Sequence, residues 1–419
     1  MKKYSFVRLI LIAVGILAIQ FLPGAFKTMI SPVLAQLAAY LKADIGWTSL
    51  VGTVPSLTMV LGSFIAGILA SKYNNKLICL IGLGLFFIGG IAPIFCSNLI
   101  IILIWRGVLG VGVGLARLFA MSWIPVFFSG RSRDIMMGFT NAAGGLMSSL
   151  ASLIGGYLGT ISWQAAFWGY SAVIVVALLV LLLVPEPLKI QREKEAEAKA
   201  KGEDITKAQP PKEKKTMAGV PAVTWHYGAL LFLEYCCVIV MYSIISSHLA
   251  ASGLGKSMEA GVAISVTGFV MAVVAVCFVG VTAVLKRWGI PVAMALGAIG
   301  YFIMFSAHSL PMIYLGFGIV GAGMGISNPT IFNYVIIDCH KNIEMSNAIV
   351  LAGLTLGQFL SSFYLKGMVM IFGTNYYVMF LTSGILLACN MIYGICVVAW
   401  RNKAEKAEIM VSEPASVKA

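Results

Sequence analysis

Residues 99–127 read LIIILIWRGVLGVGVGLARLFAMSWIPVF. A helix crosses the ~30 Å hydrocarbon core of a bilayer with about 20 apolar residues, so this run is long enough to span a membrane. Its glycines at positions 110, 112 and 114 allow other helices to pack closely against it. Similar runs along the chain predict an all-α membrane protein with roughly twelve transmembrane helices, near residues 6–38, 46–70, 77–95, 99–127, 136–158, 164–184, 225–249, 260–285, 290–308, 312–337, 345–369 and 375–400.

Composition and charge agree with this interpretation. The chain is 60% hydrophobic and 11% charged, and its mean hydropathy is +0.94, which is far more apolar than a water-soluble domain. Of its 29 lysines and arginines, 23 fall at the two ends, in alternate loops and in one polar stretch, while the intervening loops hold only Lys42 and Lys256. Basic residues collect on the cytoplasmic side. We therefore expect both termini in the cytoplasm and the protein in the bacterial inner membrane, and the net charge of +13 needs no nucleic acid to explain it.

The two halves of the chain resemble each other. The glycines at 110, 112 and 114 recur at 321, 323 and 325, and the segment 67–76 has a counterpart at 280–289. A repeat at a shift of roughly 211–213 residues is typical of a duplicated helix bundle. The order predicted is an N-terminal six-helix bundle, a polar cytoplasmic linker, a second six-helix bundle and a cytoplasmic tail, at residues 1–187, 188–222, 223–400 and 401–419.

Two local motifs identify a known family. Residues 67–76 read GILASKYNNK and residues 106–112 read RGVLGVG. With twelve spans and a midpoint linker, the chain resembles the major facilitator superfamily over residues 5 to 400. This resemblance implies two pseudo-symmetric six-helix bundles that rock about a central site in alternating access, without a bound cofactor.

The first motif departs from the family pattern. Ser71 stands where the family has an acidic residue, and the family's carboxylate at that position latches the cytoplasmic ends of the bundles together. We therefore expect gating to depend on Ser71, on the basic loop residues Lys72 and Lys76, and on Asp134.

Charged side chains inside the apolar runs are the first functional candidates. Such residues are costly at bilayer depth and usually face a wet cavity or a partner. Five are present: Lys27, Arg106, Arg117, Glu234 and Lys366. Because four positive charges face one negative charge, internal pairing cannot neutralise them all. A bound anion is the expected complement.

Among these cations, Arg117 is the best candidate for direct substrate contact, because it follows the small residues near mid-depth of its helix. Its repeat-related position is Asn328. Lys27 is the second candidate, since the outer half of the first helix lines the cavity in the family. The alternative for Lys27 is that its ammonium snorkels to the outer headgroups. Lys366 lies near the outer interface, where the same alternative is favoured.

Arg106 and Glu234 are candidates for proton coupling. In the family the arginine at the position of Arg106 lies inside its bundle and is linked to proton movement, and bonds to nearby backbone are the structural alternative. Glu234 is the carboxyl deepest in an apolar run, where it could take up and release a proton. The alternatives are a lasting ion pair with one of the arginines and a place near the cytoplasmic interface.

Uncharged polar residues complete the predicted substrate site. They lie on helices expected to line a cavity, although each could instead bond a neighbouring helix. They are Thr28, Asn141, Tyr242, Asn328 and Gln358.

Enzymatic and metal chemistry find no support in the sequence. The chain lacks a GxxxxGK[ST] phosphate loop, and its histidines and cysteines do not show metal-ligand spacing. We expect no enzyme activity, cofactor or resident metal. The hypothesis is a monomeric secondary transporter that moves a small organic anion and is coupled to protons or to a counter-substrate. The alternative is a proton-driven efflux antiporter for drugs or metabolites.

Overall fold

The computed structural model describes residues 6–70, 73–129, 131–187, 220–339 and 343–412. Within these ranges, the side chains of residues 131, 134, 137, 138, 141, 279, 344 and 406–412 are not described. The predicted linker therefore lies mostly outside the described residues. In the described part, the chain is helical throughout and contains no strand.

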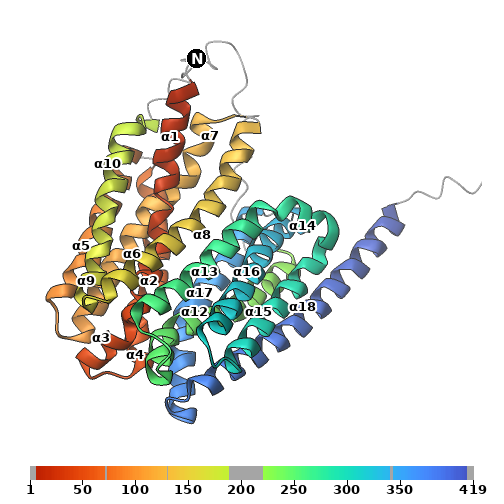
Figure 1. Ribbon diagram of the computed structural model, residues 1–419. Coiled ribbons are helices and arrows are strands. Elements are labelled where there is room, and N and C mark those ends of the chain that lie inside the picture. The colour runs from red at the N-terminus through yellow and green to blue at the C-terminus, as the bar shows by residue number, and fades with distance from the viewer. Residues whose placement is uncertain (1–5, 71–72, 130, 188–219, 340–342, 413–419) are drawn as a thin grey trace, which may run out of the picture.

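The N-terminal half forms one set of membrane helices (Figure 1). These are α1 (Phe6–Ala18), α2 (Phe21–Thr28), η1 (Ser31–Val33), α3 (Leu34–Leu41), α4 (Ile45–Ala70), α5 (Asn75–Ile91), η2 (Ala92–Phe95), α6 (Leu99–Ser122), α7 (Ile124–Phe127), α8 (Arg131–Gly159), α9 (Trp163–Trp168), η3 (Gly169–Ala172) and α10 (Val173–Leu183).

The C-terminal half forms a second set of membrane helices. These are α12 (Ala222–Ser252), α13 (Ser257–Val276), α14 (Phe278–Leu285), η5 (Lys286–Trp288), α15 (Gly289–Phe305), α16 (Leu310–Asp338), α17 (Ile343–Phe372) and α18 (Tyr376–Ser412). Helix α18 continues well past residue 400, where the sequence predicted the membrane span to end.

Eleven helical segments of the described chain are long and apolar enough to cross a membrane. Helix α8 has 29 residues, and at 1.5 Å per residue it is about 43 Å long, which is enough for a twelfth span. The predicted all-helical membrane fold is confirmed.

The glycine repeat produces the same packing in both halves. In α6, a side chain at Gly110 or Gly114 would collide with the backbone of α4, and one at Gly112 with that of α5. In α16, Gly321 faces the backbone of α13 in the same way, and Gly323 faces that of α15. The repeated motif thus brings three backbones into direct contact at corresponding places in each half.

The first membrane segment is broken, and the breaks follow its prolines. Regular helix is interrupted before Pro23, which lies in the first turn of α2, and again before Pro32, which lies in η1. Proline has no N–H and leaves the carbonyl four residues earlier without a helical donor. Between these breaks, α2 carries Lys27.

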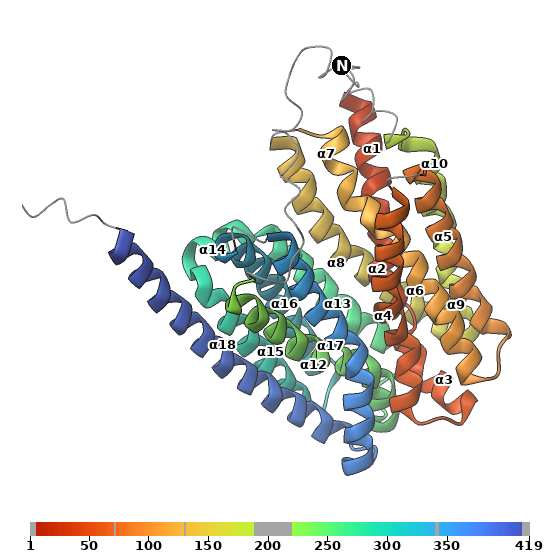
Figure 2. The same ribbon diagram turned by 180° about the vertical axis from the view of Figure 1, so that it is seen from behind.

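The two halves meet along the end of the molecule opposite the N-terminus, and their helices diverge toward the end that carries it (Figures 1 and 2). Helix α8 packs on α13 and α4 packs on α17. At Gly156 the α8 backbone is so close to Gly261 of α13 that an added Cβ would lie 2.9 Å from the Gly261 Cα atom. The hydroxyls of Ser149 and Ser152 donate to the α13 carbonyls of Ser265 and Gly261, each at 2.8 Å. We call this contact of α8 with α13, over residues 145–159 and 257–272, the outer seam, because the sequence predicts that this end of the molecule faces away from the cytoplasm.

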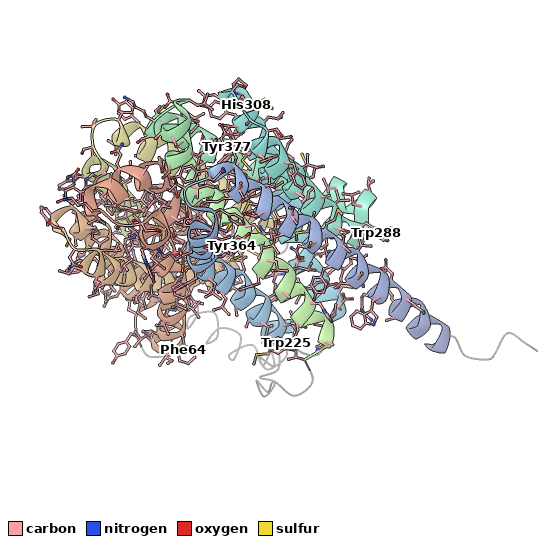
Figure 3. The ribbon with its side chains drawn as sticks, turned by 90° about the horizontal axis from the view of Figure 1, so that it is seen from below. Phe64, Trp225, Trp288, His308, Tyr364 and Tyr377 are labelled. Carbon is pink, nitrogen blue, oxygen red and sulfur yellow. The ribbon has the colours of Figure 1, made fainter. Side chains whose placement is uncertain are left out.

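Large aromatic side chains cover the perimeter. Phe64, Trp225 and Trp288 are 72%, 53% and 45% exposed, and Figure 3 shows them at the edge of the molecule. Such exposure in a protein with these helices is expected where lipid is the solvent.

Candidate functional site

Two cationic side chains of the N-terminal half are candidates for the site. Lys27 projects from α2 and Arg117 from α6, and the positive charge of Arg117 acts unfavourably on that of Lys27. The Arg117 guanidinium contacts the Met59 sulfur of α4 at 3.7 Å. Both side chains are only partly exposed. The two cations and the Met59 contact thus involve three helices of the N-terminal half, α2, α4 and α6.

The C-terminal half places aromatic and amide groups opposite these cations. The Lys27 ammonium lies 5.7 Å from the ring centroid of Tyr235 and 5.9 Å from that of Tyr242, both on α12. The Tyr235 hydroxyl accepts a hydrogen bond from the Asn328 amide of α16 at 3.0 Å. Lys27, predicted with the alternative of snorkelling, therefore points between the bundles, and Asn328 lies one contact away from it. We call Lys27, Arg117, Tyr235, Tyr242 and Asn328 the central site.

The cations of the central site have no acidic partner in the described structure. The ion pairs between described side chains involve Arg287, Arg401 and Lys366, and neither Lys27 nor Arg117 takes part in one. Contacts with aromatic faces stabilise an ammonium by about 0.5–2 kcal/mol. They leave the charge itself uncompensated, which makes this place suited to an anion.

Glu234 lies beside the central site. It precedes Tyr235 on α12 and is 4% exposed. One carboxylate oxygen accepts a hydrogen bond from Ser327 of α16 at 2.7 Å, whereas Oε2 has no partner among the described groups. The lasting ion pair considered from the sequence is not found in the described structure.

Arg106 serves the interior of the N-terminal bundle. Its side chain is fully buried, its Nε donates to the Val51 carbonyl at 2.7 Å, and its Nη2 donates to the Phe26 carbonyl. The Val51 carbonyl lacks its helical donor because residue 55, four positions later, is proline. The Tyr170 hydroxyl also donates to Phe26, at 2.9 Å. The backbone alternative foreseen for Arg106 is what the geometry shows.

The remaining predicted substrate residues differ in their surroundings. The Thr28 hydroxyl is buried and donates to the Gly24 carbonyl in its own helix at 2.7 Å, a local bond that occupies its one donor. Gln358 is 7% exposed on α17. Asn141 lies on α8, but its side chain is outside the described structure.

The predicted gating residues are only partly described. Ser71, Lys72 and the side chain of Asp134 lie outside the described structure. The Lys76 ammonium donates to the carbonyls of Leu181 and Val184 at 2.7 Å each. Lys76 thereby caps the end of α10 in its own bundle rather than reaching the other one.

An ion pair at the end of the molecule opposite the N-terminus joins the two bundles. Lys366 of α17 lies 3.1 Å from the Asp44 carboxylate, and its ammonium is 5.8 Å from the Trp47 ring centroid. A cavity of about 500 Å³ lies at this end and is lined in part by Asp44 and Tyr376. None of the central-site residues lines it.

Sequence reasoning missed a group of charges at the other end of the C-terminal bundle. The fully buried Asp338 carboxylate accepts hydrogen bonds from Arg287 at 2.7 Å, Tyr227 at 2.8 Å and Arg401 at 3.2 Å. Arg287 also lies 3.2 Å from Glu405. We call Arg287, Asp338, Arg401 and Glu405 the inner charge cluster. The only sequence signal was the acidic residue directly after the apolar run of α16.

Metal chemistry finds no support in the described part of the chain. No group of three or more His, Cys, Asp or Glu side chains there could hold a metal ion, and the cysteines are free thiols.

Comparison with known sequences identifies relatives that are membrane carriers. Residues 16–342 match the profile of the Major Facilitator Superfamily. The chain is 28% identical over 153 residues to the uncharacterized MFS-type transporter YvkA of Bacillus subtilis, an alignment that covers 36% of this chain and 34% of YvkA. It is 30% identical over 151 residues to the multidrug efflux protein YfmO of the same organism, covering 36% of this chain and 38% of YfmO. The matches span only about a third of these curated relatives.

Solved structures match nearly the whole fold. An inward-open structure of the xylose transporter XylE from E. coli has a TM-score of 0.71 at 16% identity, and the match covers 91% of this chain and 95% of that one. A bacterial homolog of the human lysosomal transporter Spinster, in an inward-facing and unoccupied conformation, has a TM-score of 0.71 at 15% identity, covering 94% and 96%. At these identities the likeness concerns the fold.

Proposed function

Because the chain belongs to the Major Facilitator Superfamily, we propose that this multi-pass membrane transporter moves a small organic anion across the cytoplasmic membrane by alternating access. One observation carries the proposal: Lys27, which lies against the Tyr235 ring of the other bundle, and Arg117, whose charge opposes that of Lys27, form no ion pair with a carboxylate in the described structure. Two like charges in a region of low dielectric repel each other, so a bound carboxylate relieves an unfavourable arrangement. The chain acts as a monomer in this proposal, with both termini in the cytoplasm.

Alternating access would use the outer seam and the Asp44–Lys366 pair as the closed outer contact. These contacts lie at the end of the molecule away from the N-terminus, and the helices diverge toward the other end (Figure 2). With the termini in the cytoplasm, as proposed, this conformation is that of a carrier open to the cytoplasm. Opening the outer end requires the α8–α13 and α4–α17 contacts to separate.

Glu234 is the proposed proton carrier. Its carboxylate has one partner, Ser327, and a second oxygen that is buried and unpartnered. A proton on that oxygen removes a buried charge. Glu234→Gln should therefore abolish proton-driven accumulation and leave substrate exchange intact. Loss of both activities would contradict a role in coupling.

The anion proposal is tested by thermal unfolding of the purified protein with propionate, succinate, benzoate and the lipophilic cation tetraphenylphosphonium. A ligand that binds only the folded state raises the melting temperature by mass action. At least one carboxylate should stabilise the wild type, and Arg117→Ala and Lys27→Met should each remove that effect. Lys256→Ala is the matched control, because Lys256 is exposed between α12 and α13.

The second candidate is efflux of lipophilic cations. Glu234, the Tyr235 and Tyr242 rings and the Met59 sulfur offer an acidic and polarisable surface, and the relatives include proteins named as multidrug transporters. Stabilisation by tetraphenylphosphonium that survives Arg117→Ala but not Glu234→Gln would replace the anion proposal with this one.

A further inference from the structure

The C-terminal wall of the central site has hydrogen-bonding capacity that the described protein does not use. The Asn328 amide nitrogen donates to the Tyr235 hydroxyl at 3.0 Å and to the Met324 carbonyl at 3.2 Å. The amide oxygen of Asn328 is buried and has no hydrogen-bond partner. A buried acceptor without a donor is unfavourable, and a ligand that donates to it removes the cost.

Tyr235 supplies a donor next to that acceptor. Its oxygen accepts from Asn328, so its own O–H proton remains available for another group. A hydroxyl group both donates and accepts. An adjacent O–H donor and amide acceptor therefore match a hydroxyl on a ligand.

This pair lies directly beside the cations. The Tyr235 ring centroid is 5.7 Å from the Lys27 ammonium. On the same turn of α16, Pro329 cannot donate to the Gly325 carbonyl four residues earlier, which weakens the helix's own use of that acceptor. A ligand whose carboxylate binds Lys27 and Arg117 would place hydroxyl groups on its neighbouring carbons next to the Asn328 amide oxygen and the Gly325 carbonyl.

Building on the anion transport proposed above, we propose that the cargo is a hydroxylated carboxylic acid, such as a hydroxy acid or a sugar acid. Lys27 and Arg117 hold its carboxylate, and Asn328 with Tyr235 hold a hydroxyl. An ammonium group in place of the hydroxyl fits less well. It would bring a third positive charge to Lys27 and Arg117.

The test compares acids that differ in one substituent, using thermal unfolding of the purified full-length protein over a range of ligand concentrations. The two hydroxyl pairs are lactate with propionate and 3-hydroxybutyrate with butyrate, and alanine tests the ammonium. A site built to bond a hydroxyl discriminates strongly against the analogue that lacks it, so each hydroxy acid should bind at least about tenfold tighter than its partner. In Asn328→Ala that ratio should fall to within about twofold, because the affinity for the hydroxy acid falls toward that for the plain acid. Asn333→Ala, the same change five residues later on α16, should keep the wild-type ratio.

Tyr235→Phe is the second variant. It removes the hydroxyl, which is both the proposed donor to the ligand and the acceptor of the Asn328 amide, and it should lower the ratio even if Asn328→Ala does not fold. Equal binding of hydroxylated and plain acids by the wild type would overturn this inference and leave anion transport standing. Tighter binding of alanine than of lactate would also overturn it. If no carboxylate binds at all, the proposed function fails and this inference fails with it.

Discussion

The two bundles share a fold and a glycine motif but treat positive charge in opposite ways. In the C-terminal bundle, Arg287 and Arg401 both bond the buried Asp338 carboxylate. In the N-terminal bundle, the charges of Lys27 and Arg117 oppose each other, and neither forms an ion pair with a described acidic side chain. Charges that are paired and buried hold helices together, whereas charges that are held unpaired are available to a ligand. We therefore propose that the pseudo-symmetric halves have different roles: the charges of one stabilise its fold, and the charges of the other bind the ligand.

The largest effect is expected from removing Asp338, which tests whether the paired charges stabilise the C-terminal bundle. Asp338→Ala leaves two arginines next to each other without their shared carboxylate, and breaking a buried pair costs about 3–5 kcal/mol. We expect a large loss of folded protein in the membrane, measured by fluorescence-detected size-exclusion chromatography. Glu405→Ala is the control, because the Glu405 side chain is 46% exposed, and it should behave like the wild type. Equal effects of the two changes would show that Asp338 has no special role.

The next change acts on the contact between the bundles. Gly261→Leu puts a side chain where the α13 backbone meets Gly156 of α8, so the outer seam cannot close. Transport should fall by at least about tenfold, since a carrier held in one state cannot cycle. Gly280→Leu is the matched control, because nothing lies within 4 Å of its added Cβ atom.

Cysteine labelling from one side of the membrane tests whether an open outer seam causes the transport defect of Gly261→Leu. A cysteine at Ser246, which bonds Ala35 across the bundles at 3.2 Å, should react faster with a membrane-impermeant maleimide from outside in Gly261→Leu than in the wild type. An unchanged rate would mean that the transport defect has another origin.

A smaller effect with an unusual sign is expected at Lys27. Lys27→Met keeps the apolar stem and removes one of two repelling charges. The folded protein should gain about 1 kcal/mol, as is common when a binding residue is removed, while anion binding is lost. Differential scanning calorimetry without ligand measures the gain. A clear drop in melting temperature would show that the aromatic contacts of Lys27 outweigh the repulsion and would contradict the contrast between the bundles.

The smallest effect is expected at the outer ion pair. Asp44 and Lys366 are 28% and 25% exposed, and exposed pairs contribute about 0.2–1 kcal/mol. Asp44→Asn should shift the balance slightly toward the outward-open state, seen as a modest rise in maleimide labelling at position 246. The wild type in high salt should show the same rise because salt screens the pair. A change as large as that of Gly261→Leu would make this pair the main outer lock.

The sequence predicted features that arise within one helix or from the repeat. The glycines at 110, 112 and 114 predicted the packing of α6, and charges inside apolar runs pointed to Lys27, Arg117 and Glu234, whose roles remain predictions. Partners far apart in the chain could not be read from one sequence. Tyr235 meets Lys27 and Lys366 meets Asp44 only because the halves fold against each other.

Two predicted residues instead form hydrogen bonds to backbone carbonyls of their own bundle. The Thr28 hydroxyl bonds its own helix, and Lys76 bonds carbonyls at the end of α10. Neither bond could be predicted from the hydropathy pattern, because the acceptors are backbone carbonyls, which every residue has. Asp338 was overlooked for a related reason: at the end of an apolar run, a buried acid and a solvated loop acid look alike.

Helix α18 has a practical consequence. Its 37 residues correspond to about 55 Å, well beyond the ~30 Å of hydrocarbon. Just past residue 400, its Arg401 and Glu405 form ion pairs with Asp338 and Arg287 of the inner charge cluster. The helix is thus a rigid rod attached to one bundle. A tilt of that bundle by about 10° moves the far end of the helix by roughly 10 Å. A fluorophore near Ser412, paired with one on the N-terminal bundle, turns this geometry into an optical readout of each transport cycle in single molecules.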